Sequence, residues 1–167
     1  DYDADGWPDL FFSRLYQPAV LLRNLGDGTF ADVTESAGLA GLSKTSGIAW
    51  ADLDNDGALD LILTTVGVSS HHLMINDGSG HFTDEAVARN LDLNDGFPQT
   101  GTSVAVGDYD LDGWLDVYLG DWHTHAIGTQ PSHARLLHNR GALEPAVFDD
   151  VTLSAGVDVD QVYLQAD

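Results

Sequence analysis

Cysteine is absent from the sequence, so the chain has no disulfide framework and its redox compartment stays open. Basic residues are scarce: 6 Lys and Arg stand against 27 Asp and Glu, for a formal net charge of -21. Nucleic acid and anionic membrane surfaces would repel such a chain, which excludes both as partners. No apolar run approaches the roughly 20 residues that span a bilayer, so we expect no membrane insertion. Cations remain as the natural partners.

The acidic residues are interleaved with Trp, Phe, Leu and Val rather than gathered in polar runs. With 43% hydrophobic residues among 167, the chain has the material for the core of an ordinary domain, which argues against intrinsic disorder. The first residue is Asp1 rather than Met. We therefore expect a processed, trimmed or fragmentary sequence, upstream of which a signal peptide could have stood.

One nine-residue pattern, D-x-D-x-D-G-x-x-D, occurs three times, beginning at Asp1, Asp52 and Asp108. The starts are 51 and 56 residues apart, which fits a supersecondary unit of about 50 residues. A second element, an asparagine followed by glycines and then Phe, trails each copy in register, from Asn24, Asn76 and Asn139. The sequence is therefore an array of similar units.

Both ends of the chain fall at the same point of this repeat. Ala166-Asp167 matches Ala51-Asp52, which opens the second copy of the pattern. We expect Asp167 to be the first residue of a further loop, and the chain to be an excerpt from a longer array.

Between the acidic loops the segments are short, rich in β-branched or aromatic residues, and bounded by Gly, Asp and Asn, as is typical of strands. Strands of about five residues joined by Gly-rich turns predict four-stranded antiparallel units. The predicted strands are 47–51, 61–66, 72–75 and 81–84 in one unit and 103–106, 115–119, 135–138 and 147–151 in the next. The runs Leu61-Ile62-Leu63 and Val104-Ala105-Val106 are apolar on both faces, as expected of strands sandwiched between sheets.

A four-stranded sheet cannot bury both faces alone, and radial stacking of such sheets gives an all-β fold, the β-propeller, usually of four to eight blades. We expect residues 1–46 to supply strands B to D of a first blade, 47–100 a second blade, 101–161 a third, and 162–167 strand A of a truncated fourth. Three blades are too few to close by that range, which predicts an open arc. Pairing of 162–166 with the strand near 10–13 is the alternative.

The repeated loops have the composition of a calcium site, because calcium takes 6–8 oxygen ligands in flexible geometry. Positions one, three, five and nine would bind through carboxylates and position seven through its carbonyl, while the glycine at position six allows the turn. The predicted ligands of three Ca²⁺ sites are Asp1, Asp3, Asp5, Trp7, Asp9, Asp52, Asp54, Asp56, Ala58, Asp60, Asp108, Asp110, Asp112, Trp114 and Asp116. Four carboxylates in one site repel one another unless a cation neutralises them, so we expect occupied sites.

Other readings of the loops are weaker. Metal-free acidic turns are possible because Asp and Gly are common turn residues, but three complete copies favour a metal. Magnesium demands stricter octahedral geometry, and transition metals prefer nitrogen or sulfur ligands, which these loops lack. An EF-hand needs Glu at position twelve, where this sequence has Phe12, Leu63 and Leu119 in predicted strands.

The stretch from Thr100 to Gly120, with the acidic loop at its centre, resembles the FG-GAP/VCBS repeats of integrin α-subunit propellers. The Asn-x-Gly-x-Gly-x-Phe and Asp-Val-Thr-x-x-Ala-Gly elements are still more similar to bacterial VCBS proteins and the cartilage acidic protein group. This resemblance implies a seven-bladed extracellular propeller, calcium between strands A and B, and a role in adhesion or recognition. The motif departs from the integrin pattern at Thr100-Gly101 and at Gly120-Asp121-Trp122, so integrin-type ligand binding is not implied.

No nucleophile elbow or phosphate-binding loop occurs, and we expect the chain not to be an enzyme. The function that we expect is that of a calcium-stabilised scaffold, extracellular or on the cell surface, that binds protein or glycan. The alternative is a noncatalytic propeller portion of a larger secreted enzyme, such as a polysaccharide lyase.

A protein or carbohydrate partner is expected on the face opposite the calcium loops, which carries the longest irregular segments, 91–99 and 120–133. The candidate contact residues are Tyr16, His71, Trp122, His123 and His125. Two alternatives stay open there: Trp122 packs between blades, and His123 and His125 share a zinc or copper ion.

Overall fold

The computed structural model describes residues 1–94, 98–121 and 134–157. These residues form strands only, apart from one short 3₁₀ helix, η1. The elements are β1 (Leu10–Phe12), β2 (Val20–Asn24), β3 (Phe30–Asp32), β4 (Thr45–Ala51), β5 (Asp60–Thr65), β6 (His72–Asn76), β7 (Phe82–Asp84), β8 (Gly101–Gly107), β9 (Asp116–Asp121), β10 (Arg135–Asn139), η1 (Gly141–Leu143) and β11 (Phe148–Asp150). In the described part of the chain, no helix has the length and apolar character to cross a membrane.

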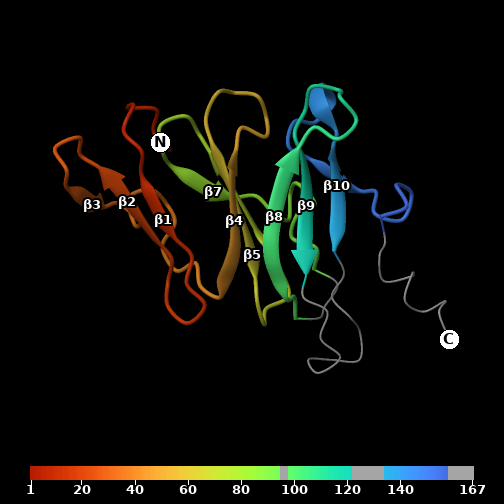
Figure 1. The fold of residues 1–167 in the computed structure, drawn as a ribbon, viewed down its shortest axis with the longest axis horizontal. Helices are drawn as coiled ribbons and strands as arrows, with labels where there is room; N and C mark the ends of the chain where they lie inside the picture. Colours follow the sequence, from red (N-terminus) through yellow and green to blue (C-terminus); the bar gives the residue numbers. More distant parts are fainter. Residues whose placement is uncertain (95–97, 122–133, 158–167) are drawn as a thin grey trace.

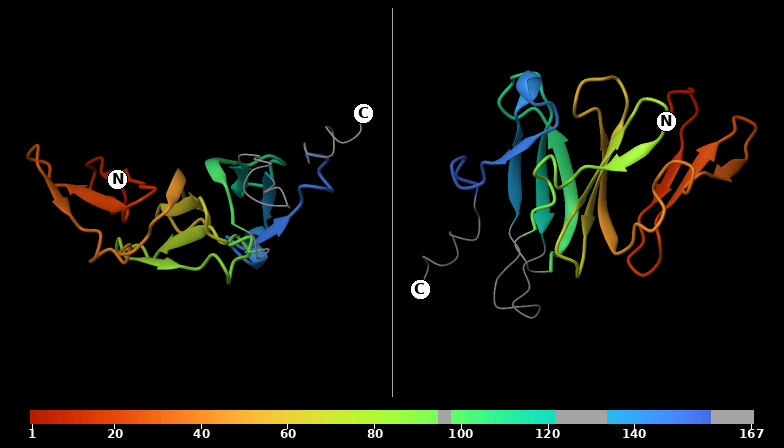
Figure 2. Two further views of the ribbon diagram at one scale, coloured as in Figure 1. Left: turned by 90° about the horizontal axis from the view of Figure 1, so that it is seen from below. Right: turned by 180° about the vertical axis from the view of Figure 1, so that it is seen from behind.

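The strands form three antiparallel sheets that follow one another along the chain (Figure 1). The first sheet has the order β1-β2-β3, the second β4-β5-β6-β7 and the third β8-β9-β10-β11, so each is a meander. The views in Figure 2 show the sheets side by side, with the N-terminus beside the first. The predicted all-β class is confirmed, and the four-stranded sheets are consistent with propeller blades.

The second sheet is the middle layer, and its strand β5 is buried along its whole length. Leu61 and Leu63 pack toward the first sheet in one core that includes Leu21, whereas Ile62 packs toward the third sheet in another core that includes Leu137. Successive side chains of a strand point to opposite faces, so an apolar run on β5 feeds both cores. The prediction that Leu61-Ile62-Leu63 is sandwiched is confirmed.

The corresponding prediction for Val104-Ala105-Val106 is wrong. In β8 Ala105 is exposed, and Val104 and Val106 are only half-buried. β8 lies beside β4, and the described residues leave much of its surface uncovered. Apolar residues on both faces of this strand therefore do not mean burial on both faces.

A close approach between sheets explains one glycine. A Cβ added to Gly47 of β4 would lie 2.9 Å from the Cα of Ser103 in β8 and 2.7 Å from Oγ1 of Thr64. Side chains larger than hydrogen would push the second and third sheets apart.

The strand bounds also differ slightly from the predicted ones, because β4 begins at Thr45 and β8 at Gly101. The predicted strand at 162–166 lies outside the described residues.

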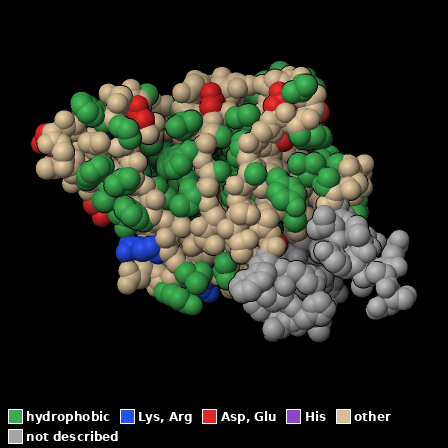
Figure 3. Space-filling model, viewed as in Figure 1, with side chains coloured by type: hydrophobic (Ala, Val, Ile, Leu, Met, Phe, Trp, Pro, Cys, Tyr) green, Lys and Arg blue, Asp and Glu red, His purple; other side chains and the backbone are tan. Residues whose placement is uncertain are grey.

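The loops before β1, between β4 and β5, and between β8 and β9 all emerge at one end of the sheets, at the top in Figure 1. These are the three acidic repeats, called here loop 1 (1–9), loop 2 (52–60) and loop 3 (108–116). Figure 3 shows Asp and Glu side chains spaced along the same upper edge. The loop between β1 and β2 emerges at the opposite end.

Candidate metal sites in three acidic loops

The three loops have the same backbone conformation. The residue at position four is left-handed in each, with φ of 56° at Ala4, 58° at Asn55 and 64° at Leu111. The glycine at position six has φ between 91° and 93° in all three. L side chains rarely adopt that conformation, which explains the glycine of the repeat.

The first aspartate of each loop orders the backbone of the loop. In loop 2 the Asp52 carboxylate accepts hydrogen bonds from the backbone N–H groups of Asp56 and Gly57, at 3.1 and 3.0 Å. The backbone N–H of Ala58 in turn donates to Oδ1 of Asp56 at 2.8 Å. Loops 1 and 3 repeat all three bonds. Local hydrogen bonding of this kind is why Asp rather than Glu suits the pattern.

The carboxylates at positions one, three and five converge in loops 1 and 2. One oxygen from each residue lies within 4.8 Å of the others. The groups are Asp1, Asp3 and Asp5 in loop 1, Asp52, Asp54 and Asp56 in loop 2, and Asp108, Asp110 and Asp116 in loop 3. In loop 3, Asp110 and Asp112 also converge with His138, which the sequence reading did not include. Each loop can therefore bring several charged oxygens onto one cation.

The donor set of loop 2 fits calcium, which prefers oxygen ligands. Oδ1 of Asp54 is buried and has no hydrogen-bond partner in the described structure. Burial, with a smaller contribution from the charge of Asp56, raises the pKa of the Asp54 carboxyl. A buried acceptor without a donor is costly, and a cation bound by these carboxylates would satisfy it.

The aspartate at position nine has a structural role that the repeat pattern alone does not show. Asp60 is fully buried and accepts bonds from the backbone N–H groups of Leu53 (3.1 Å) and Asn76 (3.0 Å). Asp9 and Asp116 make the matching bonds in loops 1 and 3. Burial raises the pKa of Asp60 to about 7. Calcium ligation by position nine stays a prediction.

The asparagine that ends β6 and β10 joins one loop to the next. The Nδ2 group of Asn76 donates to the carbonyl of Leu59 in loop 2 (3.2 Å) and to that of Tyr2 in loop 1 (2.9 Å). Asn139 likewise bonds to loop 3 and, at 2.9 Å, to the carbonyl of Leu53 in loop 2. Sequence reasoning saw these residues only as repeat markers, because the bonds link different sheets.

The side chains at position seven pack against a neighbouring turn. A Cβ added to Gly26 would lie 2.7 Å from the ring of Trp7, and one added to Gly141 would lie 2.9 Å from Trp114. Ala58, at the same position of loop 2, is smaller than either indole. The absence of a side chain at Gly26 and Gly141 leaves room for the indole rings, which explains why Trp is tolerated at position seven. Calcium ligation by the position-seven carbonyls stays a prediction.

The predicted partner residues are only partly described. Tyr16 is 92% exposed, as expected of a contact residue. His71 is not available for contact, because it is 1% exposed and its Nδ1 accepts a bond from the backbone N–H of Thr65. Its place between β5 and β6 turns the ring inward. Trp122, His123 and His125 lie outside the described residues.

Comparison with known proteins agrees with this architecture. Residues 1–63 match the FG-GAP-like repeat family. Cartilage acidic protein 1 of Xenopus tropicalis is 28% identical over 117 residues, which cover 68% of this chain and 17% of that protein. The chain thus matches less than a fifth of the length of this relative. Residues 1–63 are therefore similar to the FG-GAP-like repeat family, the sheets of the chain are consistent with propeller blades, and the chain is distantly similar to cartilage acidic protein 1.

Proposed function

We propose that this chain is a calcium-stabilised extracellular scaffold, without catalytic activity of its own, that binds a protein or glycan partner. The observation that carries the proposal is the threefold recurrence of one loop conformation in which acidic side chains converge at one edge of stacked sheets. Acids placed this way cost stability unless a cation joins them. Three copies on one rigid array serve a framework rather than a reaction.

The open face opposite the acidic loops has a feature that supports partner binding. A hollow of about 650 Å³ lies beside the loop between β1 and β2 and the connection that follows β3. Its lining includes the polar side chains of Arg14, Asp32 and Glu35 beside the apolar Pro18 and Ala19. Such mixed lining suits sugar hydroxyls or a peptide loop.

The loop that borders this hollow is fixed rather than loose. The Arg14 guanidinium donates to the carbonyl of Pro18 at 2.6 Å and to the side chain of Gln17 at 2.9 Å. Tyr16 projects from the same loop with 92% of its surface exposed. An exposed tyrosine on an ordered loop is a suitable anchor for a sugar ring or an interface.

Binding is tested on a neutral-glycan microarray and on a panel of immobilised extracellular proteins, in calcium and in chelator. We expect binding in calcium that Tyr16→Ala reduces at least tenfold. Leu143→Ala is the matched control, since Leu143 is also 92% exposed but lies in η1, at the end that carries the acidic loops. If both variants lost binding equally, the partner would not bind at the hollow. If the protein bound neither the glycans nor the proteins, the scaffold proposal would be contradicted.

A further inference from the structure

The residue before the strand-ending asparagine contacts the acidic loop of its own blade in the first and third sheets, and it differs among the three blades. It is Arg23 in β2, Ile75 in β6 and His138 in β10. The register of these strands is the same, because the following asparagine bonds to the position-nine aspartate in every blade. Of the three side chains, Arg23 alone carries a permanent positive charge.

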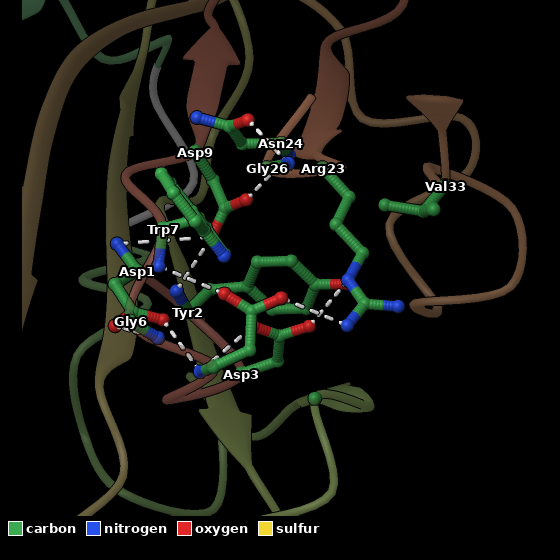
Figure 4. A network of polar contacts seen from close by, with 12 residues as sticks. Asp1, Tyr2, Asp3, Gly6, Trp7, Asp9, Arg23, Asn24, Gly26 and Val33 are labelled. Carbon is green, nitrogen blue, oxygen red and sulfur yellow. Dashed lines mark hydrogen bonds and ion pairs between the residues drawn. The ribbon is translucent and has the colours of Figure 1, made fainter. Parts of the chain in front are cut away.

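Arg23 reaches into the acidic cluster of loop 1, as Figure 4 shows. Its Nε lies 2.7 Å from Oδ2 of Asp3, and one Nη lies 2.9 Å from Oδ2 of Asp5. The guanidinium therefore holds the side chains at positions three and five together. An arginine guanidinium is not deprotonated in proteins, so this cation is permanent.

The matching place in loop 2 has no such cation. Ile75 is apolar and packs against the core between the second and third sheets. The basic group that approaches Asp54 is Arg89, whose Nη lies 3.9 Å from Oδ2 while its Nε bonds to Glu85 at 2.7 Å. Asp54 keeps one buried oxygen without a partner, whereas Oδ2 of Asp3 in loop 1 forms an ion pair with Arg23, although the angle at Nε is not that of a hydrogen bond.

Loop 3 lies between these two cases. Nδ1 of His138 is 3.1 Å from Oδ1 of Asp116 and 3.6 Å from Oδ2 of Asp110. An imidazole nitrogen can itself ligate a metal, whereas a guanidinium offers donors only. His138 can therefore join the oxygen ligands of loop 3, where it converges with Asp110 and Asp112.

We propose that Arg23 serves as the resident cation of loop 1, so that this loop is held together without calcium while loops 2 and 3 bind it. The guanidinium occupies carboxylate oxygens that a metal ion would need, and its charge repels an approaching divalent ion. Loop 1 then has at least tenfold weaker calcium affinity than loop 2, although its acidic motif is complete. This inference rests on calcium binding by the other two loops.

The test isolates loop 1. In Asp54→Ala/Asp110→Ala protein, loops 2 and 3 each lose position three, and loop 1 is intact. Titration calorimetry with calcium is expected to show two sites in the wild type and none in the double variant. Adding Arg23→Ile, the residue found at this place in blade 2, is expected to create one site. Its calcium affinity should be at least tenfold higher than that of loop 1 in the double variant. Arg23→Lys, which keeps the charge, is the matched control and is expected to create none.

Two further variants keep the test decisive if the triple variant does not fold, as judged by circular dichroism. Arg23→Ile alone is expected to raise the number of sites from two to three, and Ile75→Arg to lower it from two to one.

The outcomes separate this inference from the proposed function. Three equivalent sites in the wild type, or an Arg23→Ile protein that gains no site, overturns the role of Arg23 and leaves calcium binding intact. A wild type that binds no calcium at millimolar concentration overturns the proposed function itself.

Discussion

The asparagine that links loops 1 and 2 offers the most direct perturbation of the array. Asn76 is 1% exposed, and its side chain makes four hydrogen bonds: it donates to the carbonyls of Tyr2 and Leu59 and accepts from the N–H groups of Gly78 and Gly80. A buried hydrogen bond contributes about 1 kcal/mol net, and more where a partner is left unsatisfied. Asn76→Ala should therefore lower the free energy of unfolding by about 4 kcal/mol.

The matched control is Asn24→Ala in the first sheet. Asn24 makes the equivalent bonds within its own blade, to the carbonyl of Pro8 and from the N–H of Gly26, both at 3.0 Å. Among the described residues, the Asn24 side chain makes no hydrogen bond to another acidic loop. Because Asn24 makes two of these bonds where Asn76 makes four, Asn24→Ala should lower the free energy of unfolding by about 2 kcal/mol. Urea unfolding in saturating calcium measures both variants. If Asn76→Ala cost no more than Asn24→Ala, the bond between loops would contribute nothing to stability.

The remaining predictions concern calcium, a glycine and a histidine. Chelation should lower the melting temperature by several degrees for each site emptied, since calcium at a hundred times its Kd adds about 2.7 kcal/mol to the free energy of unfolding. Asp56→Ala should reproduce part of that loss. An unchanged melting temperature would refute stabilisation by calcium. Gly26→Ala should lower the free energy of unfolding by about 1–2 kcal/mol more than Gly78→Ala. Both glycines have φ above 70°, but of the two only Gly26 abuts the Trp7 ring. Equal urea midpoints for the two variants would show that the contact with Trp7 does not affect stability. Burial lowers the pKa of His71 to about 4 from 6.5, so the stability that neutral His71 contributes is complete above pH 6.5 and is lost as the pH falls toward 4. The loss should reach about 3 kcal/mol, measured by urea unfolding as the difference between the pH profiles of wild type and His71→Asn; parallel profiles would contradict it.

The fold was largely predictable because the repeat carries local information. The alternation of short apolar segments with Gly-rich turns located the strands of the second and third sheets to within two or three residues. Burial was harder to predict, since it depends on what lies next to a strand rather than on the strand itself. Ala105 and Ile62 sit in similar apolar runs, yet Ala105 is exposed and Ile62 is 0% exposed, because β5 contributes to a core on each face, whereas the described residues leave Ala105 of β8 uncovered.

The candidate site was predictable for the same reason and to the same limit. The spacing of Asp52, Asp54 and Asp56 within one tight loop predicts their convergence, and the structure brings their oxygens within 4.8 Å. Arg23 and His138 approach the loops from another strand of the blade, about 20 or more residues away in sequence. No local spacing encodes such a contact, so sequence reasoning treated the three loops as equal.

Metal binding and blade packing meet at one residue, the aspartate at position nine. Asp60 closes loop 2 and also accepts the backbone N–H of Asn76, whose side chain holds loop 1. A cation in loop 2 would compensate the buried charge of Asp60, and so would favour the same arrangement that orders the contacts between blades. Calcium affinity and stacking are then linked, and each strengthens the other. With Arg23 as the cation of loop 1, the dependence on calcium falls on loops 2 and 3, so chelation would weaken both contacts between sheets, the one through Asn76 and the one through Asn139.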